Sequence, residues 1–186
     1  DKIRAYDIGP GNCLIDEWIR KNSKKRYDKN GYLAKSGKTD KLILNQALEN
    51  FSVNLNYEKS LDVKDFDIFF VKGLSLENGA ATITDFTAKL IADGMNYSHN
   101  IEQSFKSKWL VCGGGRKNRY LLESIRNNFK QISIDPIDKY EIDGDFVESQ
   151  AFAFLAIRSS KGMPISFPNT TRCKKPITGG VIVENF

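Results

Sequence analysis

Hydrophobic and polar residues alternate along the chain with two different periods, which predicts an α/β fold. Spacing of three to four residues is typical of amphipathic helices. The clearest apolar stripe comprises Leu14, Ile15, Trp18 and Ile19. Asn12 precedes this stripe and is a favourable residue for an N-cap. Helical spacing recurs over residues 32–35, 41–49 and 80–93. We expect the last of these helices to end at Gly94, because glycine is common just after a helix.

Strand-like patterns open the chain and flank a run of glycines. Residues 2–6 alternate charged and apolar side chains, which predicts a half-buried strand. The apolar run 109–112 predicts a buried strand that leads directly into Gly113–Gly115. An amphipathic stretch ending at Phe129 and a short apolar stretch at 132–134 follow. The order strand, glycine turn, helix, strand is typical of a βαβ unit.

The helix that begins after 143–145 is apolar on nearly every side. Its apolar residues are Phe146, Val147, Ala151, Phe152, Ala153, Phe154, Leu155 and Ala156. A helix that is hydrophobic all round is expected to be buried. A carboxylate inside such a helix needs a specific partner, so the pattern favours a functional role for Glu148.

Composition and charge narrow the possible partners. The net charge is +5, with basic clusters at 21–26 and 172–175. No aromatic-and-basic motif of an RNA- or DNA-binding module accompanies them, so we expect solvated surface and no nucleic-acid partner. No apolar run approaches the ~20 residues of a membrane span. The three cysteines form no CxxC pair, which predicts unpaired thiols in a cytoplasmic protein rather than disulfides or a zinc site.

Two glycine turns carry the candidate chemistry. Gly113–Gly115 lacks the spacing of the dinucleotide fingerprint and of the P-loop, so a nucleotide site and a plain tight turn fit it equally well. The segment Asp7–Asn12 places a carboxylate beside two glycines. Such a turn would hold a metal-bound water or face a phosphoryl group, although a simple capped turn explains it as well. The loop 58–62 would reach a sugar or phosphate, and an exposed loop is an equal interpretation.

Taken in order, these segments resemble the C-terminal half of the anhydro-N-acetylmuramic acid kinase family, within the hexokinase–actin–Hsp70 superfold. The matching stretches are residues 6–19, 27–38, 59–62, 76–88, 111–118, 142–156, 162–171 and 177–180. The resemblance implies the C-terminal lobe of an actin-like ATPase (ribonuclease H-like), a mixed sheet flanked by helices. Residues 1–186 would then form the single nucleotide-side lobe of a two-lobe kinase whose N-terminal lobe is absent.

The resemblance also implies a reaction. It is the ATP- and Mg²⁺-dependent opening of the anhydro ring of 1,6-anhydro-N-acetylmuramic acid with phosphorylation of the sugar, in peptidoglycan recycling. The residues implied for the adenosine side of ATP are Gly113, Gly114, Gly115 and Asn118. Those implied near the phosphates are Asp7, Gly9, Gly11 and Asn12, with Asp7 also a metal ligand through water. Glu148 would face the sugar. The family's TGRE-like motif corresponds here to Ser60-Leu61-Asp62, and we transfer no role to it.

Two family features do not occur in the sequence. They are the glycine-rich phosphate loop and the catalytic aspartate, which we expect upstream of Asp1 on the missing N-terminal lobe. We therefore assign no catalytic residue to this chain and predict it to be inactive alone, because phosphoryl transfer depends on positioning and charge stabilisation.

The resemblance is also compatible with a homodimer. Alternative hypotheses are a Rossmann-like nucleotide- or adenosyl-dependent transferase, with Asp135 holding a ribose, and a non-enzymatic basic binding module.

Overall fold

The computed structural model describes residues 3–52, 61–102, 108–129 and 133–183, and divides the chain into two compact units. The glycine-turn unit comprises residues 7–144. The α6 unit comprises residues 1–6 and 145–186. Each unit has its own internal contacts and is described by itself.

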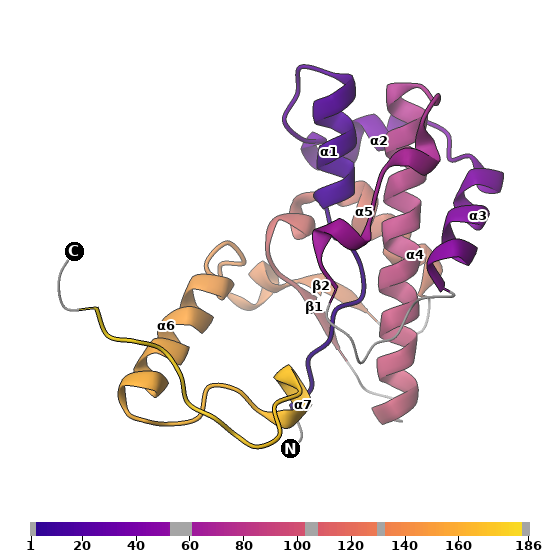
Figure 1. Cartoon of the computed structure of the whole chain (residues 1–186). Helices are drawn as coiled ribbons and strands as arrows, with labels where there is room; N and C mark the ends of the chain where they lie inside the picture. The colour runs from indigo at the N-terminus through magenta and orange to yellow at the C-terminus, as the bar shows by residue number, and fades with distance from the viewer. Residues whose placement is uncertain (1–2, 53–60, 103–107, 130–132, 184–186) are drawn as a thin grey trace. The chain divides into compact units, whose positions relative to one another are not determined.

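The glycine-turn unit is built around one long helix. Its helices are α1 (Cys13–Asn22), α2 (Tyr32–Ser36), α3 (Lys41–Ser52), α4 (Leu76–Glu102) and α5 (Arg119–Asn128). Helices α1, α2, α3 and α5 all pack against α4, the long vertical helix of Figure 1. The helices predicted from apolar spacing after Asn12 and around 32–35 and 41–49 are thereby confirmed.

The predicted βαβ unit is also confirmed. Strands β1 (Trp109–Val111) and β2 (Ile134–Pro136) pair in parallel, with Trp109 opposite Ile134, and α5 connects them. Helices therefore flank a small parallel sheet, as an α/β fold requires. The second strand begins later than predicted, at Ile134, and residues 130–132 lie outside the described part of the chain.

Helix α4 separates two hydrophobic clusters. Its large side chains Ile83, Phe86 and Leu90 belong to the cluster formed with α1, α2 and α3. Its small residues Ala88 and Ala92 belong to the other cluster, which includes buried residues of α5 and β2. Small residues let the backbones of two helices approach closely. Ala88 and Ala92 thus let α5 approach this face of α4, to which Met95 also belongs.

Helix α4 is longer than predicted, because Gly94 does not end it. The helix runs on to Glu102, and Gly94 is buried within it. A Cβ at this position would lie 2.5 Å from Cγ2 of Ile8. One turn earlier, a Cβ at Gly9 would lie 3.4 Å from Cβ of Leu90. The glycine therefore makes room for the segment that leads into the first glycine turn.

The α6 unit departs from two predictions. Residues 3–6 form no strand, and Ile3 is 75% exposed. An alternating pattern becomes a strand only when a neighbouring strand pairs with it, whereas here Ala5 N donates to Asn169 O at 3.2 Å. Helix α6 (Val147–Ser160), which we expected to be buried, has no buried residue. The short helix α7 (Pro168–Thr171) completes this unit.

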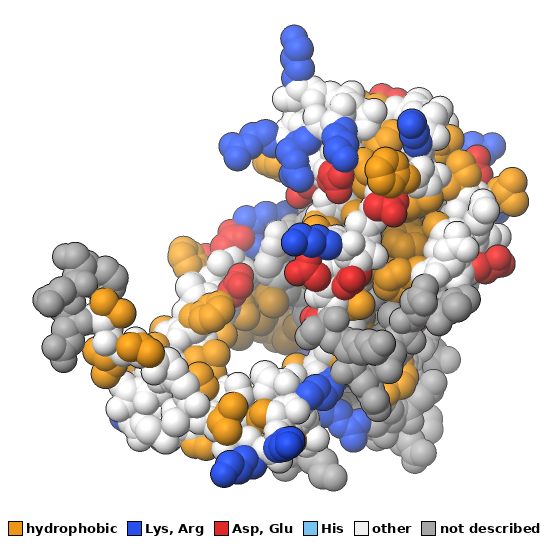
Figure 2. All heavy atoms as spheres, in the orientation of Figure 1, with side chains coloured by type: hydrophobic (Ala, Val, Ile, Leu, Met, Phe, Trp, Pro, Cys, Tyr) orange, Lys and Arg blue, Asp and Glu red, His pale blue; other side chains and the backbone are white. Residues whose placement is uncertain are grey.

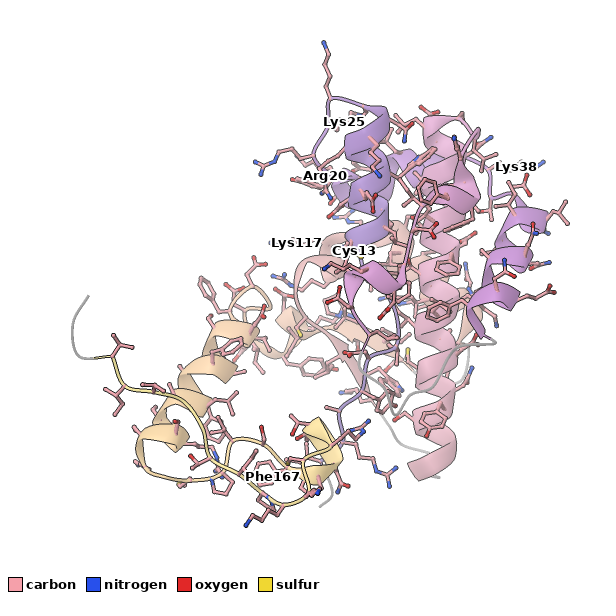
Figure 3. The ribbon with its side chains drawn as sticks, in the orientation of Figure 1. Cys13, Arg20, Lys25, Lys38, Lys117 and Phe167 are labelled. Atoms are coloured by element: carbon pink, nitrogen blue, oxygen red, sulfur yellow. The ribbon has the colours of Figure 1, made fainter. Side chains whose placement is uncertain are left out.

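The basic cluster at 21–26 lies on the surface, as we expected. Lys21, Lys24, Lys25 and Arg26 are all exposed. Figure 2 shows Lys and Arg side chains, in blue, gathered at the top of the glycine-turn unit, and Figure 3 labels Lys25 there. No helix within the described residues is long and apolar enough to span a bilayer.

Substitution of Gly94 tests how α4 receives the N-terminal segment. Helix propensity alone predicts that Gly94→Ala stabilises the chain by about 1 kcal/mol. Because the new methyl would collide with Ile8, we expect instead a loss of about 1–3 kcal/mol. Urea unfolding followed by circular dichroism measures the change.

The matched control is the same substitution in an Ile8→Gly background. There the collision is absent, and Gly94→Ala should no longer destabilise the chain. Equal losses in both backgrounds would contradict the proposed contact.

Candidate functional site

The turn after β1 has a backbone conformation that requires glycine at its first position. Gly113 adopts φ 70° and ψ −172°, a region that side-chain-bearing residues avoid. Its N–H donates to the carbonyl of Gly144 at 3.0 Å, which fixes the start of the turn. Gly114 follows in a 3₁₀ turn, Gly114–Lys117, and both Gly113 and Gly114 are exposed. The backbone of this turn is thus open to a ligand.

The second glycine motif meets this turn through Asn12. Asn12 is the N-cap of α1, but its side chain makes no capping hydrogen bond. Its Nδ2 instead lies 3.9 Å and 3.8 Å from where Cβ atoms on Gly114 and Gly115 would be. The structure therefore brings two glycine motifs, about a hundred residues apart in sequence, to one place. The predicted capping bond of the Asn12 side chain is wrong, while its position as the N-cap is right.

The other atom of the same amide is unsatisfied. Asn12 Oδ1 is buried and has no hydrogen-bond partner among the described residues. A buried polar atom without a partner costs about 1–3 kcal/mol, so such atoms in native proteins call for an explanation. An N–H or O–H group of a bound molecule would satisfy it.

Two helix N-termini border this place. Helix α1 begins immediately after Asn12, and α5 begins at Arg119, after the 3₁₀ turn. Figure 3 labels Cys13 at the start of α1 and Lys117 of that turn. Helix N-termini carry partial positive charge and favour anions. Burial raises the pKa of the Cys13 thiol above its ordinary value.

Asp7 is held by the loop that contains the SLD motif. Its Oδ2 accepts a hydrogen bond from Leu61 N at 2.9 Å. Asp62 of the same motif accepts from Lys64 N at 3.0 Å and caps a 3₁₀ turn, Val63–Asp65, so its role in this structure is local. Residues 58–60, which belong to the same predicted loop site, lie outside the described residues.

Asn118 caps helix α5, and it follows the glycine turn at which we predicted an adenosine contact. Its Oδ1 accepts from Leu121 N at 3.1 Å and caps α5, and the residue is buried. A Cβ on Gly31 would lie 2.3 Å from this oxygen. The capping bond explains why asparagine stands here, and an adenosine contact stays a prediction.

Arg116 organises the glycine turn, and sequence reasoning missed it. Its side chain is only 5% exposed, although it carries a full charge. Its Nε and Nη2 donate to the two oxygens of Asp138 at 2.7 Å and 3.0 Å, and its Nη1 donates to Gly113 O at 3.0 Å. A Cβ on Gly144 would lie 2.4 Å from Arg116 Nε, so this glycine gives the guanidinium its space.

The partners of Arg116 are distant in the sequence, so no local pattern indicates this role. Asp143 Oδ1 also lies 3.6 Å from Arg116 Nη2. The hydrogen bonds from Arg116 hold the pKa of Asp138 below its ordinary value.

Glu148 does not fit the reasoning that selected it. We expected a buried carboxylate, but Glu148 is exposed in the first turn of α6. Nothing in its surroundings therefore demands a partner, and burial no longer supports a functional role. Acidic residues in the first turn of a helix are favourable in their own right. Its assignment to a sugar site stays a prediction that rests on resemblance.

Comparison with known proteins identifies the family. The family model described as anhydro-N-acetylmuramic acid kinase matches residues 1–185. The chain belongs to the anhydro-N-acetylmuramic acid kinase family. Curated proteins of that name from Pelagibacter ubique, Rhodospirillum rubrum and Methylobacterium nodulans are 52%, 40% and 37% identical to it.

The same comparisons define how much of the family protein is present. The aligned regions cover 100%, 95% and 96% of this chain, but only 50%, 46% and 46% of the three relatives. The chain thus spans about half the length of the anhydro-N-acetylmuramic acid kinases that it matches.

The ion pair between Arg116 and Asp138 predicts a specific acid sensitivity. Because the pKa of Asp138 is lowered in the folded chain, the unfolded state binds more protons as the pH falls below the ordinary value of 3.8. The stabilisation is therefore present above that value and lost below it. Asp138→Asn should be less stable than wild type near neutral pH, and the difference should shrink as the pH falls towards 3.

Urea midpoints measured from pH 6 to pH 3 test this expectation. Asp93→Asn is the control, since Asp93 makes an exposed ion pair with Lys89 on α4 and should change stability by less than about 0.5 kcal/mol near neutral pH. A difference between Asp138→Asn and wild type that is constant over the whole range would contradict the assigned role.

Proposed function

We propose that this chain is the C-terminal, nucleotide-binding half of a kinase that opens 1,6-anhydro-N-acetylmuramic acid and phosphorylates it with ATP. The observation that carries the proposal is the meeting of Asn12 with Gly114 and Gly115, where Asn12 Oδ1 is buried without a partner among the described residues. Family membership supplies the reaction class, since the relatives are named for this activity.

ATP fits this arrangement through its phosphates and its adenosine. Glycine backbones allow a ligand to approach their N–H groups closely, and the N-termini of α1 and α5 favour negative charge. We assign the adenosine to the side of Gly113, Gly114, Gly115 and Asn118. We assign the phosphates to the side of Gly9, Gly11 and Asn12. Because Asn12 Oδ1 is an acceptor, its partner there would be a magnesium-bound water or a ribose hydroxyl and not a phosphate oxygen.

Magnesium fits as an ion carried with the nucleotide rather than in a protein cage. The residues that the structure describes contain no group of three or more His, Cys, Asp or Glu that could hold a metal. Mg²⁺ is commonly bound by one or two carboxylates, waters and substrate phosphates, so Asp7 suffices as the chain's contribution, through a water. The ion would neutralise charge on the transferring phosphoryl group.

The remaining chemistry belongs to the other half of the longer protein. We assign to that half the phosphate loop and the carboxylate that activates the attacking water. The present chain would form an actin-like (ribonuclease H-like) lobe of the kinase, with Glu148 on the sugar side. A cytoplasmic location stays a prediction from the unpaired cysteines, and a homodimer stays a prediction as well.

The Rossmann-like hypothesis requires an acidic residue that is available to bind a ribose, and Asp135 is already engaged by other side chains. Asp135 would have to hold a ribose, but its carboxylate is paired with Lys139 Nζ and accepts from Tyr140 OH at 3.3 Å. The pKa of Asp135 is lowered chiefly by Lys139. A carboxylate engaged in this way is less available to ribose hydroxyls, so the kinase hypothesis is the better supported one.

Joining the two halves tests the proposed reaction. We expect the chain alone to be inactive with Mg²⁺–ATP and 1,6-anhydro-N-acetylmuramic acid. A fusion to the half of the Pelagibacter ubique protein that this chain does not match should phosphorylate the sugar, as measured by coupled ADP release. A folded fusion that neither binds ATP in calorimetry nor releases ADP would refute the proposal.

Substitutions at two neighbouring glycines distinguish an effect on ATP binding from an effect on folding stability. In Gly114→Ala the new methyl would meet only Asn12 Nδ2, at an ordinary contact distance. It should therefore leave stability unchanged while it occupies ligand space, and we expect ATP affinity in the fusion to fall by about tenfold, or ~1.4 kcal/mol. In Gly113→Ala the strained φ of 70° should cost about 1–3 kcal/mol of stability.

Calorimetry with Mg²⁺–ATP and urea unfolding on both variants make the comparison. Wild-type affinity in Gly114→Ala would contradict the placement of the nucleotide at this turn.

A further inference from the structure

The α6 unit exposes hydrophobic residues that a folded protein normally covers. Phe152, Phe154 and Ile157 of α6 are 64%, 60% and 55% exposed. Figure 2 shows hydrophobic side chains along the segment that carries α6. No described residue of the unit is buried. A segment of this size without a core does not fold stably by itself, so another surface must cover it.

The exposed residues lie on opposite sides of α6. Successive residues of a helix are rotated by about 100°, so Phe152 and Phe154 project about 200° apart. Ile157, three residues after Phe154, shares the side of Phe154. One neighbouring surface covers one side of a helix and leaves the other in water. Helix α6 therefore has the composition of an inner layer with a neighbour on each side.

The chain's own tail makes polar and cation–π contacts with α6. The Arg158 guanidinium lies 5.6 Å from the Phe154 ring centre and 5.9 Å from that of Phe167. Arg158 Nε also donates to Pro164 O at 2.7 Å. These contacts fasten the tail to the helix, yet Phe154 is still 60% exposed. Covering this surface requires a further layer of protein.

We propose that α6 inserts into the other half of the same kinase, which contacts Phe152 on one side of the helix and Phe154 on the other. The inference rests on the proposed function in one respect, namely that the missing half belongs to this family. The relatives are about twice as long as this chain, so a second body of similar size accompanies it there. Glu148 stands in the first turn of α6, so the same contact would bring the assigned sugar residue to the other half.

Co-expression of the two halves as separate chains tests the interface without chemistry. The partner is the half of the Pelagibacter ubique protein that this chain does not match. We expect a 1:1 complex in the absence of nucleotide. Phe152→Ser and Phe154→Ser should each weaken it by about tenfold or more, as aromatic anchors of an interface do. Leu42→Ser is the matched control, since Leu42 is 78% exposed on α3 of the glycine-turn unit, and it should leave the affinity unchanged.

Hydrogen exchange provides a second readout that does not depend on the variants. Amides of α6 should exchange more slowly in the complex than in the chain alone. A complex whose α6 amides gain no protection would overturn the proposal. A second outcome would also overturn it, namely that this chain forms a dimer with itself, that Phe152→Ser dissociates this dimer, and that the other half does not bind.

The outcomes separate the interface from the reaction. Halves that bind through α6 but remain inactive, also when fused, would support the interface and refute the kinase reaction. An active fusion whose separate halves never associate would refute the interface and leave the reaction standing.

Discussion

The glycine turn depends on one buried guanidinium. Arg116 joins the carbonyl of Gly113 to the carboxylate of Asp138, and Gly144 supplies the space in which it lies. Glycines alone leave a loop with many conformations, because glycine loses more backbone freedom on folding than any other residue. A planar, permanently charged group with several donors restricts that freedom by binding two segments at once. The turn can therefore be open to a ligand and still have a defined shape.

Helix α4 restricts the conformation of the first glycine motif, residues 7–12, as Arg116 does for the second. Gly94 and Leu90 receive Ile8 and Gly9 on one side of the helix, and this contact directs the following residues towards Asn12. The opposite side presents Ala88, Ala92 and Met95 to α5, whose N-terminus follows the second turn. One helix thus positions the segments next to both glycine motifs. The proposed site is a consequence of how α4 packs, even though α4 contributes no predicted site residue.

Much of this arrangement was predictable from the sequence, and the exceptions share one cause. Apolar spacing identified α1, α2 and α3, and the run before Gly113 identified the parallel βαβ unit. These signals are local, because a helix or a buried strand shows its period in its own residues. The extension of α4 past Gly94, the absence of a strand at residues 3–6 and the exposure of α6 depend instead on partners distant in the sequence. The glycine motifs were recognised because each is a local run of residues. Their meeting at Asn12 and the role of Arg116 were not recognised, because both depend on contacts between segments that are distant in the sequence.

The most direct test of the central claim is a crystal structure of the two fused halves with Mg²⁺ and a non-hydrolysable ATP analogue. The account predicts the adenosine against Gly113–Gly115, and a donor of the nucleotide or of an ordered water within about 3 Å of Asn12 Oδ1. A nucleotide bound away from both glycine turns, with Asn12 Oδ1 still unsatisfied, would contradict it.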